Sequence, residues 1–150
     1  MSEPFRIRRI RASDLDRIQE IEVASFGEDA YDRKLFAEYF RRCGGFFLGV
    51  GKGRNICGYM LTCMRADAAR AEVISLAVEP KARQKGAASA LMRSTLRRLR
   101  LRGVPRVDLM VKVTNRPAQR FYRRFGFVPL KIVPAYYEDG RAGIRMVLSM

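Results

Sequence analysis

The sequence predicts an α/β (α+β) layered domain, in which a mixed central sheet carries helices on both faces. Short apolar runs alternate with stretches of 3.6-residue periodicity, in the order β-α-α-β-β-β-α-β-α-β-β. The composition, with 48% hydrophobic and 10% aromatic residues, is that of a globular protein. We therefore expect about six to seven strands and about four helices in one domain over residues 1–150.

The first part of the chain predicts a strand followed by two helices. Apolar side chains within the basic stretch 5–10 indicate an opening strand. Ser13 and Asp16 have the S-x-x-D spacing of a capping box, so we expect the first helix to begin there. A second helix is expected where four apolar side chains share one face, before Gly44 and Gly45 end it. These side chains are Leu35, Phe36, Tyr39 and Phe40.

A hairpin, a third strand and a long helix are expected in the middle of the chain. The apolar runs 46–50 and 56–64 flank a glycine-containing turn, which is typical of an antiparallel hairpin. Another apolar run covers 73–78. The strongest helical stripe follows over 88–99, with apolar or small side chains at i, i+3, i+4, i+7, i+8 and i+11. Gly103 then ends this helix.

The last part predicts a strand, a helix and two closing strands. Apolar residues alternate over 107–113, as in a half-buried strand. A short helical stripe covers 118–125, and Pro117 stands at its start, where a missing N–H costs nothing. Two further strands are expected near 127–133 and 143–149.

The net charge of +15 and the sequence pI of about 10.7 indicate an anionic partner. A nucleic acid, a ribosome, a membrane surface or a phosphorylated cofactor would fit. Between residues 80 and 137 there are 15 Lys and Arg and one acid, Asp108, so nearly all of the excess lies in that span.

Histidine is absent, which excludes Ser-His-Asp and Cys-His catalysis and any zinc site built on imidazole. The three cysteines, Cys43, Cys57 and Cys63, form no C-x-x-C pair. Because their number is odd, we expect free thiols in a reducing compartment rather than a disulfide. The chain shows no signal peptide and no run of about 18 apolar residues. We therefore expect a cytoplasmic location without membrane contact.

One segment has the features of an anion-binding site. It joins the predicted strand 73–78 to the long helix, whose first N–H groups have no partner within the helix. Gly86 and Ala88 are small enough for a phosphate to approach the backbone, and Arg83 and Lys85 add positive charge. A tight strand–helix turn with exposed basic residues is the structural alternative.

Three motifs in order resemble the GNAT acetyltransferase superfamily. Arg83–Ala88 has the pattern R-x-x-G-x-[GA], which resembles the acetyl-CoA loop of that family. Asn115–Phe127 is similar to the family pattern N-x-x-A-x-x-[LF]-Y-x-x-x-G-F. The run Tyr136–Gly140, Y-Y-E-D-G, resembles the tail of the N-terminal protein acetyltransferases. Within that family, the chain resembles the ribosomal-protein-alanine N-acetyltransferases.

The resemblance implies acetyl-CoA as acetyl donor, with no metal, held where two parallel strands splay apart. These strands would be 73–78 and 107–113. The resemblance places Asn115 on the cofactor arm and makes Tyr122 both a cofactor contact and the acid that protonates the leaving thiolate. A core tyrosine is the structural alternative for Tyr122. The other implied cofactor contacts are Leu76, Ala77, Val78, Arg83, Gln84, Lys85, Gly86, Ala87, Ala88 and Ser89.

The general base is less well marked. Relatives often carry a glutamate where this chain has Met110, and a thioether cannot accept a proton from an amine. Glu72 is the substitute that we favour, because it lies six residues before Val78, where the resemblance implies a catalytic histidine in some relatives. It also shares a strand face with apolar neighbours, which tends to raise a carboxyl pKa. A solvated Glu72 paired with an arginine is the structural alternative. Asp108, two residues before Met110, is a weaker candidate.

Tyr31, Tyr136 and Tyr137 lie where related enzymes hold a peptide backbone, which favours a protein or peptide N-terminus as acceptor. The acids Glu28, Asp29 and Asp32 lie beside Tyr31 in the sequence and could attract a basic acceptor. A small amine, such as a polyamine, an amino acid or an aminoglycoside, is therefore an alternative acceptor.

A basic module that binds nucleic acid or a ribosome without catalysis is the alternative of another class, on the stripe Arg93, Arg97 and Arg100. Basic charge beyond what one coenzyme needs could also serve an enzyme as a ribosome contact. The sequence leaves open whether the protein is a monomer or a homodimer.

Overall fold

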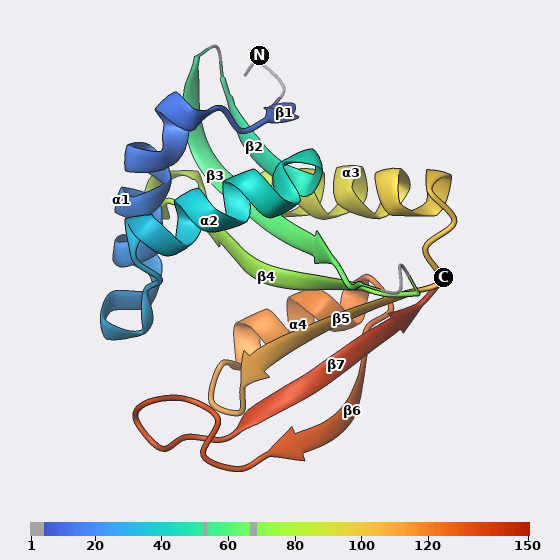
Figure 1. Cartoon of the computed structure of the whole chain (residues 1–150). Helices are drawn as coiled ribbons and strands as arrows, with labels where there is room; N and C mark the ends of the chain where they lie inside the picture. The colour runs from blue at the N-terminus through green and yellow to red at the C-terminus, as the bar shows by residue number, and fades with distance from the viewer. Residues whose placement is uncertain (1–4, 53, 67–68) are drawn as a thin grey trace.

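A seven-stranded sheet forms the centre of the computed structural model, which describes residues 5–52, 54–66 and 69–150 (Figure 1). The strand order is β1-β2-β3-β4-β5-β7-β6, and β4 and β5 form the one parallel pair among the described strands. The expected mixed sheet is therefore confirmed. Its strands are β1 (Arg6–Arg9), β2 (Phe47–Lys52), β3 (Asn55–Met64), β4 (Ala71–Val78), β5 (Arg106–Lys112), β6 (Val128–Val133) and β7 (Gly143–Ser149).

Four helices cover the two faces of the sheet (Figure 1). On one face, α1 (Leu15–Phe26) and α2 (Arg33–Cys43) enclose a core that includes Phe36 and Tyr59. On the other face, α3 (Ala87–Leu101) and α4 (Arg116–Arg124) pack on a second core that includes Leu91 and Leu109. None of the helices in the described residues is long and apolar enough to cross a membrane.

The central parallel strands separate because β4 carries a bulge. Leu61 on β3 pairs with Ser75 and the next residue, Thr62, pairs with Val73, so Ile74 is the extra residue. Parallel pairing with β5 ends at the same point, since Val73 and Leu109 are the last partners. A bulge bends the strand that contains it and interrupts the ladder. Beyond Val73 the two strands therefore diverge, as the resemblance implied (Figure 1).

The first helix does not begin at the predicted capping box. Residues Ala12–Asp14 form a short 3₁₀ turn, and α1 starts at Leu15. The capping carboxylate is Asp14, which accepts a 2.7 Å hydrogen bond from the amide of Arg11 and two from the Arg8 guanidinium. Asp16 instead pairs with Arg33 on α2. The prediction was wrong by two residues because Asp14 is held by an arginine of β1, which local spacing does not reveal.

The prediction of free thiols was wrong for two of the three cysteines. A disulfide joins Cys43, at the end of α2, to Cys63 on β3, while Cys57 is a free cysteine. The end of α2 packs against β3 and brings the two Cα atoms to 5.2 Å. The odd number of cysteines therefore means only that one thiol has no cysteine partner within the chain. It does not exclude a disulfide between the other two.

Candidate active site

A pocket of about 300 Å³ opens where β4 and β5 diverge. Residues of both strands form its floor, and residues of α1, α2, α4 and the loops before α2 and β7 form its walls. Five tyrosines line it: Tyr31, Tyr39, Tyr122, Tyr136 and Tyr137. All four tyrosines that the sequence indicated are therefore brought together, and Tyr39 joins them.

One side of the pocket is an unpaired stretch of strand edge. Past Val73, the backbone of β4 no longer pairs with β5, so Leu76 and Ala77 present that edge to the gap. An extended ligand can add to such an edge as a further strand. The carbonyl of Val78 accepts a 2.9 Å hydrogen bond from Nε of Arg83. Arg83 also donates to Ser25 at 3.2 Å, so its guanidinium ties the loop to β4 and α1.

The segment between β4 and α3 leaves a run of backbone amides without backbone partners. Gln84 and Gly86 have positive φ, at 63° and 91°, and the first helical bond of α3 runs from the amide of Ala90 to the carbonyl of Gly86. In the described chain, the amides of Gln84, Lys85 and Gly86 donate to no backbone carbonyl. The next three, of Ala87, Ala88 and Ser89, lie in the first turn of the helix and lack intrahelical partners.

Six consecutive N–H groups at the positive end of a helix are therefore available to a diphosphate. The left-handed Gln84 is the strained position that allows this arrangement, because a non-glycine residue rarely adopts positive φ. The binding of an anion at this segment stays a prediction.

Asn115 and Tyr122 close the opposite wall. Asn115 caps α4 by accepting a 3.2 Å hydrogen bond from the amide of Ala118 through its side-chain oxygen, which leaves the NH₂ group to donate into the pocket. Tyr122 lies about two turns further along α4 and packs on Phe127, with ring centroids 5.8 Å apart. Burial raises the pKa of Tyr122 to about 12. Its hydroxyl is therefore protonated at neutral pH and can act as a donor.

Glu72 lines the pocket, but it is not the isolated carboxylate that we expected. Its Oε1 accepts a 2.9 Å hydrogen bond from Nη1 of Arg65, and its side chain is 20% exposed. The arginine-paired alternative is therefore the observed state. Asp108, its register partner on β5, is 2% exposed and bonded to Arg106, and it does not line this pocket. Glu72 is thus the better placed of the two acids.

Met110 takes the place of the family glutamate on the pocket floor. Gly143 on β7 lies beside it, and a Cβ there would come within 2.7 Å of the Met110 methyl group and 3.3 Å of the Tyr136 and Tyr137 rings. Because Gly143 has no side chain, the Met110 methyl group can pack beside the rings of Tyr136 and Tyr137. This part of the floor is apolar and supplies no proton acceptor.

Sequence reasoning missed Glu22 on α1. This side chain is buried, lines the pocket, and accepts hydrogen bonds from the hydroxyls of Tyr59 and Ser75, the latter at 2.9 Å. It also accepts a 2.9 Å bond from the amide of Tyr31. A glutamate seven residues after Leu15, on the apolar face of the helix, was the signal that could have found it. Glu22 holds the Tyr31 loop against the sheet.

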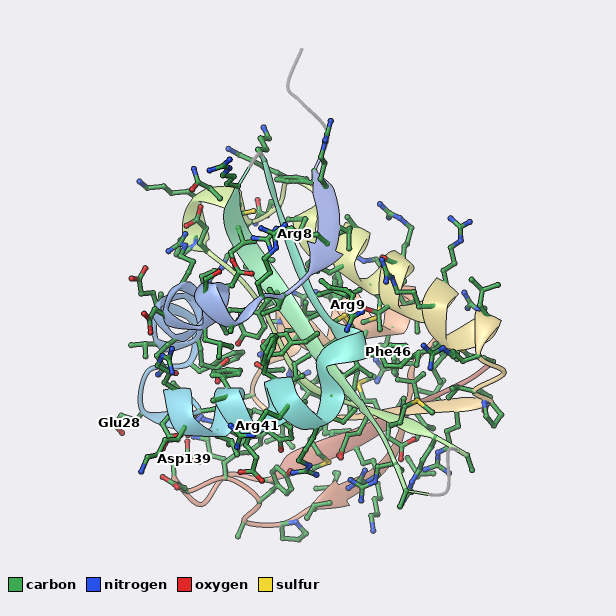
Figure 2. All side chains as sticks on the ribbon, turned by 45° about the horizontal axis from the view of Figure 1, so that its top comes forward. Arg8, Arg9, Glu28, Arg41, Phe46 and Asp139 are labelled. Atoms are coloured by element: carbon green, nitrogen blue, oxygen red, sulfur yellow. A yellow bond between two sulfur atoms is a disulfide. The ribbon has the colours of Figure 1, made fainter. Side chains whose placement is uncertain are left out.

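Lys112 connects the two loops at the mouth of the pocket. It pairs with Asp29 in the loop after α1 and, at 3.0 Å, with Asp139 in the loop before β7. Its ammonium also lies 5.2 Å from the centre of the Tyr137 ring. Figure 2 labels Glu28 and Asp139 at the lower left, one in each of these loops. The tyrosines of the two loops are therefore held on either side of one opening.

Known proteins share this architecture. The model of the acetyltransferase (GNAT) family matches residues 14–127. A candidate ribosomal protein bS18-alanine N-acetyltransferase of Bacillus subtilis is 29% identical over 133 residues, which cover 89% of this chain and 87% of the relative. An N-alpha-acetyltransferase of Sulfurisphaera tokodaii is 26% identical over 157 residues, covering 97% and 93%. The crystal structure of Ard1 from Thermoplasma volcanium superposes with a TM-score of 0.93 at 26% identity, over 97% of each chain.

The fold and the pocket define an acyltransferase built on a parallel strand pair that splays apart. The chain belongs to the acetyltransferase (GNAT) family, and it is an N-acetyltransferase. The resemblance to the ribosomal-protein-alanine N-acetyltransferases is confirmed.

Proposed function

We propose that the protein transfers the acetyl group of acetyl-CoA to the N-terminal α-amine of a polypeptide. One observation carries this proposal. The pocket has an unpaired strand edge that leads along the chain toward the free amides of residues 84–89, which lie outside its lining, and it has a tyrosine cluster between two bridged loops. A long phosphorylated donor suits the strand edge and the amides, and a polypeptide terminus suits the tyrosine cluster. Relatives whose names state N-alpha-acetyltransferase activity support the same acceptor.

The donor end fits coenzyme A through backbone groups. The β4 edge at residues 76–78 would hold the pantetheine arm, and the amides from Gln84 to Ser89 would hold the diphosphate. The NH₂ group of Asn115 would donate to the arm. Arg83 would contribute by fixing the loop, since its guanidinium already bonds Val78 and Ser25. When bound, acetyl-CoA supplies an activated acetyl thioester.

Two side chains would manage the protons of the transfer. Glu72 accepts the proton of the incoming amine through Oε2, because Oε1 is bonded to Arg65. The neutral amine then forms the new C–N bond as the C–S bond breaks, and Tyr122 donates its proton to the departing thiolate. The acylated nitrogen then loses its surplus proton to solvent, solvent returns a proton to Tyr122, and Glu72 releases its proton to solvent. Alignment of the two substrates in one pocket supplies much of the rate, and the acid and base add about 10²–10⁴-fold.

A small polycationic acceptor is less well supported, because two of the three acids near Tyr31 have structural partners. Asp29 pairs with Lys112, and Asp32 caps α2 by accepting a 2.8 Å bond from the amide of Leu35. Only Glu28 remains of the acidic cluster that the sequence indicated. The tyrosines, in contrast, offer apolar rings with polar tips, which suit an extended peptide backbone.

An acceptor panel tests the proposal. The protein is incubated with acetyl-CoA and peptides with free N-termini, the same peptides with blocked N-termini, spermidine, and free amino acids. We expect thiol release with free peptides and none with blocked ones. Faster turnover of spermidine than of any peptide would contradict the proposed acceptor. A ribosome contact through the surplus basic charge stays a separate proposal, to be tested by cosedimentation.

A further inference from the structure

A second pocket, of about 340 Å³, lies on the same sheet beside the acceptor end of the first. It is formed by β4, β5, β6, β7 and the end of the β3–β4 connection. Five of its lining residues are cationic and two are acidic, Glu72 and Asp108. The cationic residues are Arg65, Arg70, Arg106, Lys131 and Arg145. Apart from Glu72, the proposed acetyl transfer assigns no chemical step to the residues of this pocket.

The two acids hold most of these cations in place. Asp108, 2% exposed, bonds Arg106 at 2.6 and 3.0 Å and lies 3.6 Å from both Arg70 and Arg145. Arg65 is bonded to Glu72. Two carboxylates cannot neutralise five cations, so the pocket stays positive. Guanidinium groups that are already oriented lose less conformational freedom when they bind an anion.

The cationic pocket lies next to the proposed position of the acceptor α-amine, because Glu72 lines both pockets. Glu72 and Asp108 are register partners on β4 and β5. An acceptor whose α-amine reaches Glu72 therefore has the cationic pocket next to its following residues. An extended chain advances about 3.3 Å per residue, so residues three to five reach across such a pocket.

We propose that this pocket is a specificity subsite that binds acidic side chains of the acceptor polypeptide, at about positions three to five after its N-terminus. The inference rests on the proposed function. Carboxylates match the oriented guanidiniums bidentately. Nucleic acid fits less well, because none of the described residues that line the pocket is aromatic, and single strands are held by stacking on rings.

Lys131 is the residue of this pocket whose substitution disturbs the other lining residues least. It is exposed, and its register partner is Arg145 on β7. Among the described residues it forms no ion pair with a carboxylate, so its replacement leaves Asp108 and Glu72 paired. Lys131→Glu therefore alters the charge of the pocket without stranding a buried acid. Arg97→Glu is the matched control, because Arg97 is exposed on α3, on the opposite face of the sheet.

The test compares two labelled peptides with free N-termini that differ only at positions three to five, which are Asp in one and Ser in the other. Affinity is measured by fluorescence anisotropy with coenzyme A present. We expect the Asp peptide to bind about tenfold more tightly at low salt, and the preference to shrink at high salt. Lys131→Glu should reduce it about threefold or more, and Arg97→Glu should leave it unchanged.

Equal affinity for the two peptides, or an equal loss in both variants, would overturn the subsite. Absence of the peptide preference together with binding of a uridine 20-mer that Lys131→Glu abolishes would also overturn it, in favour of RNA. The proposed function is judged separately, by turnover of the Ser peptide in the unmodified protein. Turnover without a charge preference keeps the function and removes the subsite. A preference in binding without any peptide turnover keeps the subsite and removes the function.

Discussion

Lys112 on β5 and Asp139 in the loop before β7 form an ion pair of 3.0 Å across the mouth of the active-site pocket. Because Lys112 also pairs with Asp29 in the loop after α1, one side chain joins the two loops that carry the pocket tyrosines. Tyr31 belongs to the first loop, and Tyr136 and Tyr137 belong to the second. The geometry of the acceptor end therefore depends on this bridge.

Replacement of Lys112 by alanine should loosen the acceptor end and leave the donor end intact. We expect the KM for peptide to rise about threefold or more, because two loops must then be ordered on binding. The Kd for acetyl-CoA, measured by calorimetry, should stay within about twofold, because a substitution at the acceptor end does not change the contacts of the donor end. A parallel loss of acetyl-CoA affinity would show that Lys112 supports the whole pocket.

The bridge should also be insensitive to pH in the working range. The hydrogen bonds from Lys112 to Asp29 and then Asp139 raise the pKa of Lys112, so its contribution is lost only as pH rises through that raised pKa. Bonds from the Arg141 amide and then from Lys112 lower the pKa of Asp139, whose contribution is lost only as pH falls through the lowered pKa. The KM effect of Lys112→Ala should therefore be constant from about pH 5 to 9.

Tyr122→Phe should lower kcat about tenfold or more and leave acetyl-CoA affinity unchanged, since it removes a hydroxyl but keeps the ring. Burial raises the pKa of Tyr122 to about 12, so the acid form is present at lower pH and is lost as pH rises through that value. The kcat of the unmodified protein should therefore not decline below about pH 11 through this group. Unchanged turnover in the variant would return Tyr122 to a packing role.

Glu72→Gln should lower kcat/KM more at neutral than at high pH, because an amine that is already neutral needs no base. The pair with Arg65 requires a control, since the substitution also removes the negative charge from that 2.9 Å ion pair. Arg65→Gln breaks the same pair but retains the carboxylate. If Glu72 is the base, only Glu72→Gln shows the pH-dependent loss. A uniform loss over pH 6–10, or the same profile in both variants, would contradict the assignment.

The disulfide should make stability depend on redox conditions. Cys43 and Cys63 are 20 residues apart, and a loop of that length corresponds to about 3 kcal/mol in the chain-entropy model. Reduction should lower the Tm by roughly 6–12 °C for a domain of this size. Cys57→Ser should respond to reductant like the unmodified protein. A Tm that ignores reductant would show that the bridge contributes nothing.

Periodicity predicted most of the fold because each element buries a regular face. The alternating run 107–113 became β5, and the long stripe 88–99 became α3. Irregular features could not be predicted from the sequence, since they depend on partners far along the chain. The bulge at Ile74 follows from pairing with β3, and the start of α1 depends on Arg8 of β1.

The candidate site also contains features that a local motif predicts and features that depend on distant partners. The run of free amides at 84–89 follows from a local motif, so the sequence was enough to indicate it, and its role in binding a cofactor stays a prediction. The partner of Glu72 could not be predicted, because Arg65 reaches it across the β3–β4 connection. Glu22 looked like one polar residue in an apolar stripe, and its role depends on Tyr59 and Ser75 from two other strands.

The most direct test of the central claim is the position of the acetyl group on a product. A peptide with a free α-amine and an internal lysine is incubated with the protein and acetyl-CoA, and the product is sequenced by tandem mass spectrometry. We expect one acetyl group, on the α-amine, and none on the lysine ε-amine. Acetylation of the lysine with a free α-amine would contradict it, as would an unmodified peptide beside an acetylated small amine.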